Sequence, residues 1–219
     1  MQRYVVIGLG EFGTSVAETL YDAGDDVIAV DLREERVNRM AAHASRAVVG
    51  DGRERDILER IGAKGADAGI VSMGDDLGAS ILAVMALRDI GVKNLYVKVM
   101  SYEHARVLER LGVTETVFPE RESGAALAMR LGGGGSVLNY VRLGGEFSLQ
   151  EIAVPKEWIG KTLRQLALPA KYKIVIVAIH DFLRDELIPV PDPDEPLKDS
   201  DTLLLAGNID QLSKLSHLK

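Results

Sequence analysis

The chain has 219 residues, which is enough for one large domain or two modest ones, and its 47% hydrophobic content can fill a core. A formal net charge of −7 argues against a general nucleic-acid surface, because such surfaces usually carry a basic face or stripe. Since the sequence has no cysteine, it excludes a disulfide framework, a thiolate metal site and a cysteine nucleophile, and it suits a reducing cytosol.

The first part of the chain alternates short apolar runs with helical patterns. The expected strands are Tyr4–Ile7, Val27–Val30, Ala47–Val49, Ala68–Val71, Leu95–Val99 and Thr116–Phe118. The expected helices between them are roughly Phe12–Ala23, Glu34–His43, Glu54–Ile61, Leu77–Ile90 and Tyr102–Leu111. This alternation predicts an α/β fold with a Rossmann-like, doubly wound parallel sheet.

The pattern changes after Phe118. A further helix is expected at Glu120–Leu131, and the four glycines at 132–135 indicate a hinge or flexible connector. Beyond it we expect strands near Phe147–Val154, Lys173–His180 and Thr202–Gly207, short helices at Lys161–Leu168 and Ile209–Leu218, and an acidic, proline-rich loop from Ile188 to Pro196. We therefore predict two domains, residues 1–135 and a small α+β domain of residues 136–219.

A glycine motif links the first expected strand to the first expected helix. Gly8, Gly10 and Gly13 form Gly-x-Gly-x-x-Gly, with Leu9, Glu11 and Phe12 between them. The first glycine allows a tight turn, the second lets the backbone approach a diphosphate, and the third lets the helix pack on the sheet. The helix N-terminus then offers N–H groups to phosphates. Asp31 follows 18 residues after Gly13, near the spacing of a carboxylate that binds ribose hydroxyls.

Other candidates follow the second, third and fourth strands. Leu32 and Arg33 come directly after Asp31, which would repel a 2′-phosphate, so we expect no preference for NADP. Asp51 and Gly52 either meet an adenine ring or form an ordinary Asp-Gly turn. The carboxyl edge of the sheet also receives Met73, Gly74 and Asp75, and the neighbouring Asp76 is expected to cap the next helix.

No catalytic set is visible in the sequence. His43, His104, His180 and His217 lack a metal-ligand spacing, and we expect His104 to be a packing or surface residue. The sequence contains neither a Gly-x-Ser-x-Gly nucleophile elbow nor a phosphate-binding P-loop motif. No apolar run reaches the roughly 20 residues that span a bilayer, so any work at a membrane is expected to go through a partner.

Taken together, the sequence resembles the cytosolic regulatory subunits of bacterial Ktr and Trk potassium transporters, which join an RCK (regulator of potassium conductance) N-domain to a smaller RCK C-domain. The matching stretches are Val6–Gly13, Gly50–Gly52, Leu95–Lys98, Tyr102–Gly112, Phe118–Glu120, Val137–Tyr140, Ala170–Tyr172 and Ile174–Ile179. Residues 1–135 then correspond to the nucleotide-binding N-domain with its dimerisation helix, and residues 136–219 correspond to the C-domain.

This resemblance implies a regulator and not an enzyme. Members bind ADP, ATP or NAD(H), and their dimers assemble into an octameric ring beneath a membrane-embedded potassium-translocating subunit. The resemblance places such a chain in the cytoplasm, peripheral to the inner face of the membrane through its partner. Lys98 resembles the basic residue near the phosphates, and Glu120 resembles a carboxylate that in some members holds a divalent cation. Mg²⁺ or Ca²⁺ at the dimer interface is therefore implied.

Two positions depart from the family pattern. Glu11 stands where several members carry an arginine that holds a terminal phosphate, which disfavours a strong preference for ATP. Pro169 stands where members that bind cyclic di-AMP carry an arginine, which disfavours that ligand here. Two alternatives stay open: an NAD-dependent oxidoreductase, and a nucleotide-sensing module of another cation channel or antiporter.

Overall fold

The computed structural model describes residues 1–74, 76–132 and 137–215. Contacts divide the chain into two compact units, Met1–Glu120 and Arg121–Lys219. The predicted domain boundary at residues 135 and 136 and most of the predicted glycine hinge, Gly133–Gly135, lie outside the described residues, so both stay predictions. Gly132 was expected to belong to the hinge, but it is the last residue of helix α6 (Pro119–Gly132).

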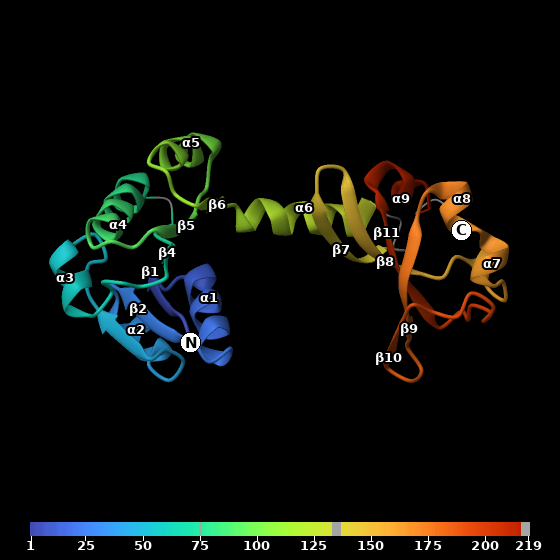
Figure 1. Ribbon diagram of the computed structural model, residues 1–219, viewed down its shortest axis with the longest axis horizontal. Helices are drawn as coiled ribbons and strands as arrows, with labels where there is room; N and C mark the ends of the chain where they lie inside the picture. Colours follow the sequence, from blue (N-terminus) through green and yellow to red (C-terminus); the bar gives the residue numbers. More distant parts are fainter. Residues whose placement is uncertain (75, 133–136, 216–219) are drawn as a thin grey trace. The chain divides into compact units, whose positions relative to one another are not determined.

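The first unit is built on a six-stranded parallel sheet with the strand order β3-β2-β1-β4-β5-β6. Figure 1 labels β1, β2, β4, β5 and β6 of this sheet. Its strands are β1 (Arg3–Ile7), β2 (Asp26–Asp31), β3 (Arg46–Val49), β4 (Ala68–Val71), β5 (Asn94–Lys98) and β6 (Glu115–Val117). All neighbouring strands pair in parallel. The predicted α/β fold with a doubly wound sheet is therefore confirmed.

Helices cover both faces of this sheet. They are α1 (Glu11–Asp22), α2 (Glu34–Met40), α3 (Arg55–Arg60), α4 (Leu77–Asp89) and α5 (Tyr102–Arg110). Successive residues of a strand point to opposite faces. Accordingly, Val6 of β1 packs in the cluster that contains residues of α1 and α2, whereas Val5 and Ile7 pack in the cluster that contains residues of α3, α4 and α5. The two cores explain why these strands read as continuous apolar runs.

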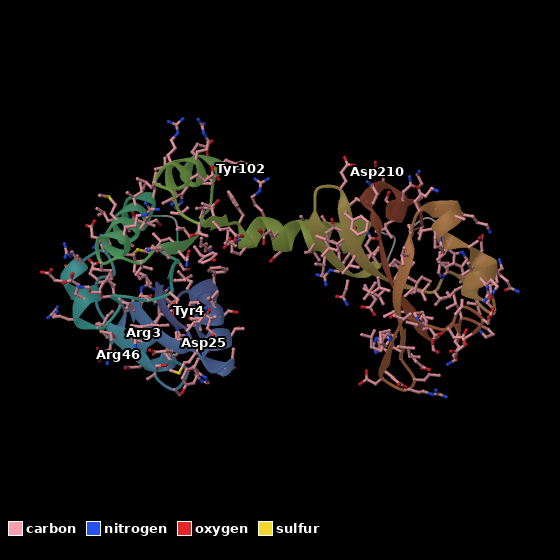
Figure 2. The ribbon with its side chains drawn as sticks, viewed as in Figure 1. Arg3, Tyr4, Asp25, Arg46, Tyr102 and Asp210 are labelled. Atoms are coloured by element: carbon pink, nitrogen blue, oxygen red, sulfur yellow. The ribbon has the colours of Figure 1, made fainter. Side chains whose placement is uncertain are left out.

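The two edges of the sheet differ in chemistry. At the amino ends of β1 and β2, Arg3 binds Asp26 with an Nε–Oδ2 distance of 2.6 Å, and the backbone N–H of Arg3 donates to Asp67; Arg3 is labelled in Figure 2. At the carboxyl ends, the chain leaves β3 on one side of β1 and returns to β4 on its other side. Such a reversal opens a crevice beside the strand ends, where α/β sheets bind ligands.

The second unit holds a five-stranded antiparallel sheet with the order β10-β9-β11-β8-β7. Its strands are β7 (Val137–Gly144), β8 (Phe147–Ala153), β9 (Val175–Asp181), β10 (Glu186–Pro189) and β11 (Asp201–Asn208). A 3₁₀ turn, η1 (Lys156–Trp158), and the helices α7 (Leu163–Leu166), α8 (Leu168–Tyr172) and α9 (Ile209–Leu215) complete it. Trp158 is buried in the core of this unit together with residues of β8, β11 and α9.

Three expectations for this unit need correction. The two edge strands β7 and β10 were not predicted, and β10 takes up Ile188 and Pro189, the start of the expected loop. The helix expected at Lys161–Leu168 ends at Leu166, because Ala167 has the left-handed φ of 48°. Pro189 lies on the edge strand β10, where proline is tolerated because its missing N–H costs the sheet no hydrogen bond.

Candidate functional site

A cleft of about 350 Å³ lies at the carboxyl edge of the parallel sheet, within the range of small-ligand pockets. The residues proposed from sequence that line it are Gly8, Gly10, Glu11, Phe12, Asp31, Leu32, Arg33, Gly52, Met73, Gly74 and Lys98. Residues that the sequence analysis did not propose also line it, namely Ile7, Val30, Arg36, Gly50 and Ser72. Leu9, Gly13 and Asp51 are not among the lining residues, and Asp75 lies outside the described part of the chain.

The three glycines of the motif have different roles. Gly8 has a φ of +91°, and a Cβ there would lie 2.2 Å from the carbonyl oxygen of Ser72. A Cβ on Gly13 would lie 1.9 Å from the carbonyl oxygen of Gly8, so this glycine lets α1 pack on the turn. A Cβ on Gly10 would meet no protein atom within 4 Å. Gly8 and Gly13 are therefore needed by the fold, while Gly10 leaves open space inside the cleft.

The N-terminus of α1 faces this open space. Gly10 is the N-cap residue, and its carbonyl accepts the first helical hydrogen bond from the N–H of Thr14 at 2.8 Å. The first N–H groups of a helix have no partner within the helix and carry the positive end of its dipole. Glu11, in the first turn, brings a carboxylate to the same place. The helix end suits phosphate, and Glu11 opposes a large negative charge beside it.

Asp31 is 7% exposed and already has several donors around it. Its Oδ2 accepts the backbone N–H of Leu9 at 2.6 Å and lies 3.3 Å from Nη1 of Arg36, and its Oδ1 accepts the N–H of Arg33 at 2.8 Å. Asp31 therefore fastens the glycine turn to the end of β2. Of the roughly four acceptor positions of the carboxylate, these three contacts leave about one, on Oδ1, without a partner among them.

Arg36 was missed by the sequence analysis. It lies in the first turn of α2, contacts Asp31 at the end of β2 and lines the cleft. Asp31 precedes α2 and lies five residues before Arg36, so the i,i+3 and i,i+4 spacings within a helix gave no signal for this contact. Arg33 and Arg36 together bring two guanidinium groups to the part of the cleft that Asp31 lines.

The pair Asp51 and Gly52 behaves mainly as a turn. Hydrogen bonds from the Arg53 side chain, with Nε at 2.8 Å from Oδ1, hold the pKa of the Asp51 carboxyl below its usual value. The backbone N–H of Arg53 also donates to Oδ1 at 3.0 Å. A Cβ on Gly52 would lie 2.2 Å from the Ile7 side chain, so the glycine allows this turn to pack against β1. Asp51 is thus occupied by Arg53, and only Gly52 reaches the cleft.

Asp76 and His104 have the roles expected from sequence. The Asp76 side chain caps α4 and accepts the N–H of Ala79 at 2.8 Å, which confirms the predicted cap. His104 is 5% exposed in α5, and burial lowers the pKa of its ring. A buried ring away from the cleft is a packing residue, in line with the sequence interpretation.

Lys98 and Glu120 form an ion pair within one chain. Lys98 is the last residue of β5 and lines the cleft, and its Nζ lies 2.6 Å from Oε1 of Glu120 in the first turn of α6. The hydrogen bond from Lys98 holds the pKa of the Glu120 carboxyl below its usual value. Within the described ranges, no group of three or more His, Asp or Glu side chains is arranged to hold a metal ion. The Lys98 ammonium is the partner of Glu120 that this chain itself supplies.

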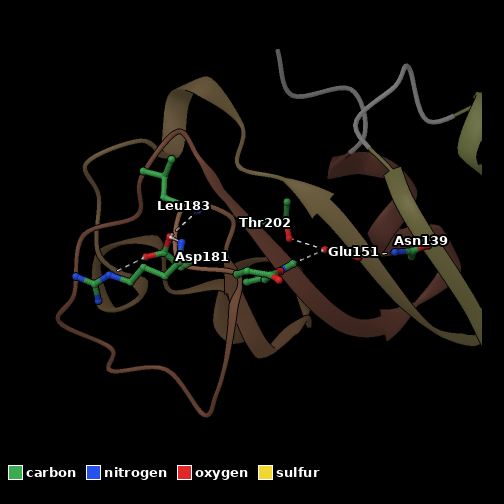
Figure 3. A network of polar contacts seen from close by, with 8 residues as sticks. Asn139, Glu151, Asp181, Leu183 and Thr202 are labelled. Carbon is green, nitrogen blue, oxygen red and sulfur yellow. Dashed lines mark hydrogen bonds and ion pairs between the residues drawn. The ribbon is translucent and has the colours of Figure 1, made fainter.

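A second polar cluster lies on the antiparallel sheet of the second unit (Figure 3). The Glu151 carboxylate accepts the Thr202 hydroxyl at 2.5 Å and the Asn139 amide at 2.6 Å, and the His180 ring lies 3.7 Å away. Burial opposes the charged form of Glu151, but these donors outweigh it, so the pKa of Glu151 lies below its usual value. These bonds join β7, β8 and β11, and we assign the cluster to sheet stability.

A neighbouring carboxylate fastens the β9–β10 turn. Asp181 accepts the N–H groups of Leu183 and Arg184 at 3.0 and 3.2 Å, and the Lys198 ammonium lies 2.9 Å from its Oδ2. The hydrogen bond from Lys198 holds the pKa of the Asp181 carboxyl below its usual value. Its oxygens are thus occupied inside the chain, which is a structural role.

In the part of the chain that the structure describes, no helix is long and apolar enough to cross a bilayer. This agrees with the short apolar runs of the sequence.

Both units resemble domains of known proteins. The TrkA-N domain model matches residues 4–119, and the TrkA-C domain model matches residues 149–219. The Ktr system potassium uptake protein C of Bacillus subtilis (strain 168) is 36% identical over 97% of this chain and 95% of its own length. The Ktr system potassium uptake protein A of the same organism is 32% identical over 94% and 92%.

The solved structures support the same fold. The GsuK channel, solved bound to NAD, covers 99% of this chain with a TM-score of 0.61 and 16% identity, and this chain spans 39% of the channel chain. At that identity the likeness concerns the fold alone. The two domain models and the full-length relatives show that the chain belongs to the Ktr and Trk family of potassium uptake proteins, as an RCK subunit with a TrkA-N and a TrkA-C domain.

Proposed function

We propose that this chain is the regulatory subunit of a potassium uptake system and that it binds an adenine nucleotide in the cleft at the carboxyl edge of the parallel sheet. The observation that carries the proposal is Gly10, which stands open to the cleft while the glycines on either side are fixed by the fold. An unobstructed backbone at a helix N-terminus is what a diphosphate requires. Relatives named as potassium uptake proteins align over nearly the whole chain.

The candidate ligands are ADP, ATP and NAD(H). Asp31 and the two arginines suit a ribose and its adenine, and Lys98 suits a phosphate. Glu11 disfavours the additional charge of a terminal γ-phosphate beside the helix end. A divalent cation, Mg²⁺ or Ca²⁺, at Glu120 would offset that charge, and we retain it as part of the proposal.

Regulation would act through assembly and not through catalysis. We infer a homodimer that assembles into an octameric ring and contacts a membrane-embedded potassium-translocating subunit, so the chain would work in the cytoplasm at the inner face of the membrane. Helix α4 supports an assembly, because it is apolar on nearly all sides and leaves Leu82 and Met85 about half exposed. A nucleotide that binds one ring conformation more tightly than another would then bias the pore.

Calorimetric titration with ATP, ADP, AMP, NAD⁺ and NADH, with and without Mg²⁺ or Ca²⁺, tests this function, together with the solution mass. We expect micromolar binding by a dimer or octamer and an effect of the cation on the ATP curve. No binding of any of these ligands would contradict the cleft. Hydride transfer to a substrate panel would instead favour the alternative oxidoreductase.

A further inference from the structure

The Lys98–Glu120 pair connects the cleft to the helix at the end of the first unit. The Lys98 side chain is 15% exposed and the Glu120 side chain 55% exposed, with 2.6 Å between Nζ and Oε1. Lys98 lines the cleft, and the first compact unit ends at Glu120. The pair therefore joins a ligand-binding wall to the first turn of α6.

The charges around the cleft make this ammonium important. The other cationic lining residues both lie beside Asp31: Arg36 contacts its carboxylate, and Arg33 follows it by two positions, where its backbone N–H donates to the same carboxylate. Glu11 and Asp31 are acidic. Lys98 is therefore the cationic lining residue that stands apart from Asp31, but Glu120 already holds that ammonium. Phosphate and carboxylate are both anionic acceptors, so they compete for its three N–H donors.

We propose that Glu120 determines phosphate affinity by competing with the bound nucleotide for Lys98. The inference rests on the proposed nucleotide function and assigns a second role to Glu120, in addition to the cation ligand implied by resemblance. When a phosphate takes the ammonium, the Glu120 carboxylate is released at the start of α6. Charge on the ligand is in this way converted into a changed contact at the end of the first unit.

The expected effect is modest because Glu120 is exposed. Exposed ion pairs contribute roughly 0.2–1 kcal/mol, which corresponds to about 1.4- to fivefold in affinity. A competitor of this strength lowers phosphate affinity without closing the site. It is also weak enough to be displaced by ligand at ordinary concentrations.

A double-mutant cycle in EDTA tests the proposal on the full chain, with ADP and adenosine as probes. Glu120→Gln removes the competing charge and is expected to tighten ADP binding by about 1.4- to fivefold while leaving adenosine binding unchanged. In the Lys98→Met background the same substitution is expected to have no effect. Glu122→Gln, at an exposed carboxylate of the same helix, is the matched control and is expected to leave ADP affinity unchanged.

The outcomes separate this inference from the proposed function. Equal or weaker ADP binding by Glu120→Gln in EDTA overturns the inference, and so does an effect that persists without Lys98. The proposed function would survive both results, since wild-type protein still binds ADP. If wild-type protein binds neither ADP nor adenosine, the proposed function fails and the inference fails with it.

Discussion

At the scale of single residues, the motif glycines separate into two that hold the fold and one that serves a ligand. A Cβ on Gly8 or Gly13 would lie 2.2 or 1.9 Å from a backbone oxygen, so a side chain at either position forces the turn apart. Gly10 has an extended backbone with φ of −74°, which any residue can adopt. The motif can therefore be tested for binding without destroying the domain.

Gly10→Val is expected to abolish nucleotide binding while the protein stays folded. The added methyl groups fill the open space of the cleft, and overpacking of about 3 kcal/mol corresponds to more than about 100-fold in affinity. Calorimetry measures the affinity and circular dichroism the fold. Gly124→Val is the control, because a Cβ there also meets no atom within 4 Å but lies on α6. Unchanged affinity in Gly10→Val would refute the proposed cleft.

Asp31→Ala is expected to weaken ribose recognition and also to destabilise the first unit. It removes a ribose acceptor, and it leaves the N–H of Leu9 without the acceptor that it has at 2.6 Å. An unsatisfied buried donor costs about 1–3 kcal/mol, which a folded domain survives. Urea unfolding measures the stability loss, and titration with ADP measures the binding loss. Full stability in Asp31→Ala would contradict the role of Asp31 in fastening the turn.

At the scale of elements, the polar cluster on the second sheet joins strands that are far apart in the sequence. Thr202 of β11 and Asn139 of β7 both donate to Glu151 of β8, which lies between them in the sheet. Since the pKa of Glu151 is lower in the folded state, its charge stabilises folding above the ordinary carboxyl range. That stabilisation is lost as the pH falls through the folded-state pKa.

Thr202→Val is therefore expected to destabilise the second unit by about 1–2 kcal/mol at pH 7, with a penalty that shrinks as the pH falls through the folded-state pKa of Glu151. The reason is that hydrogen bonds to a charged carboxylate are stronger than those to its protonated form. Fluorescence of the single tryptophan, Trp158, reports unfolding of this unit in the full chain. Glu151→Gln should make the penalty independent of pH. A penalty that does not change with pH in the parent would contradict this assignment.

At the scale of the whole molecule, α4 presents an apolar surface that one chain leaves uncovered. Leu82 and Met85 lie one turn apart on this helix and are 50% and 48% exposed. A helix that is apolar on all sides is usually buried. In the proposed homodimer, this surface is the candidate contact of the first unit.

The double variant Leu82→Glu and Met85→Glu is expected to lower the solution mass without unfolding the chain. Charges on both sides of a formerly apolar interface disfavour its burial by several kcal/mol. Light scattering measures the mass, and Leu183→Glu, at a residue that is 81% exposed on the second unit, serves as the control. An unchanged mass would show that α4 is not part of the assembly interface.

The sequence by itself determined the parallel sheet, the order of its elements and the location of the cleft. These follow from local periodicity and from glycines whose spacing has a direct steric cause, as at Gly8 and Gly13. The tertiary structure decided that Lys98 takes Glu120, 22 residues away, as its partner. The pairs of Asp51 with Arg53 and of Asp31 with Arg36 are short-range contacts that the sequence analysis did not propose.

The same division holds for the second unit. The edge strands β7 and β10 lie next to glycine and proline, and their local sequence patterns are only weakly typical of strands. They form because the neighbouring strands β8 and β9 offer backbone N–H and C=O groups for pairing. Hydrogen bonds and ion pairs between distant residues depend on how the chain brings them together, and no local pattern encodes that geometry. Periodicity therefore predicts elements and the edge where a site lies, while contacts over long sequence distances decide what each side chain in that site can do.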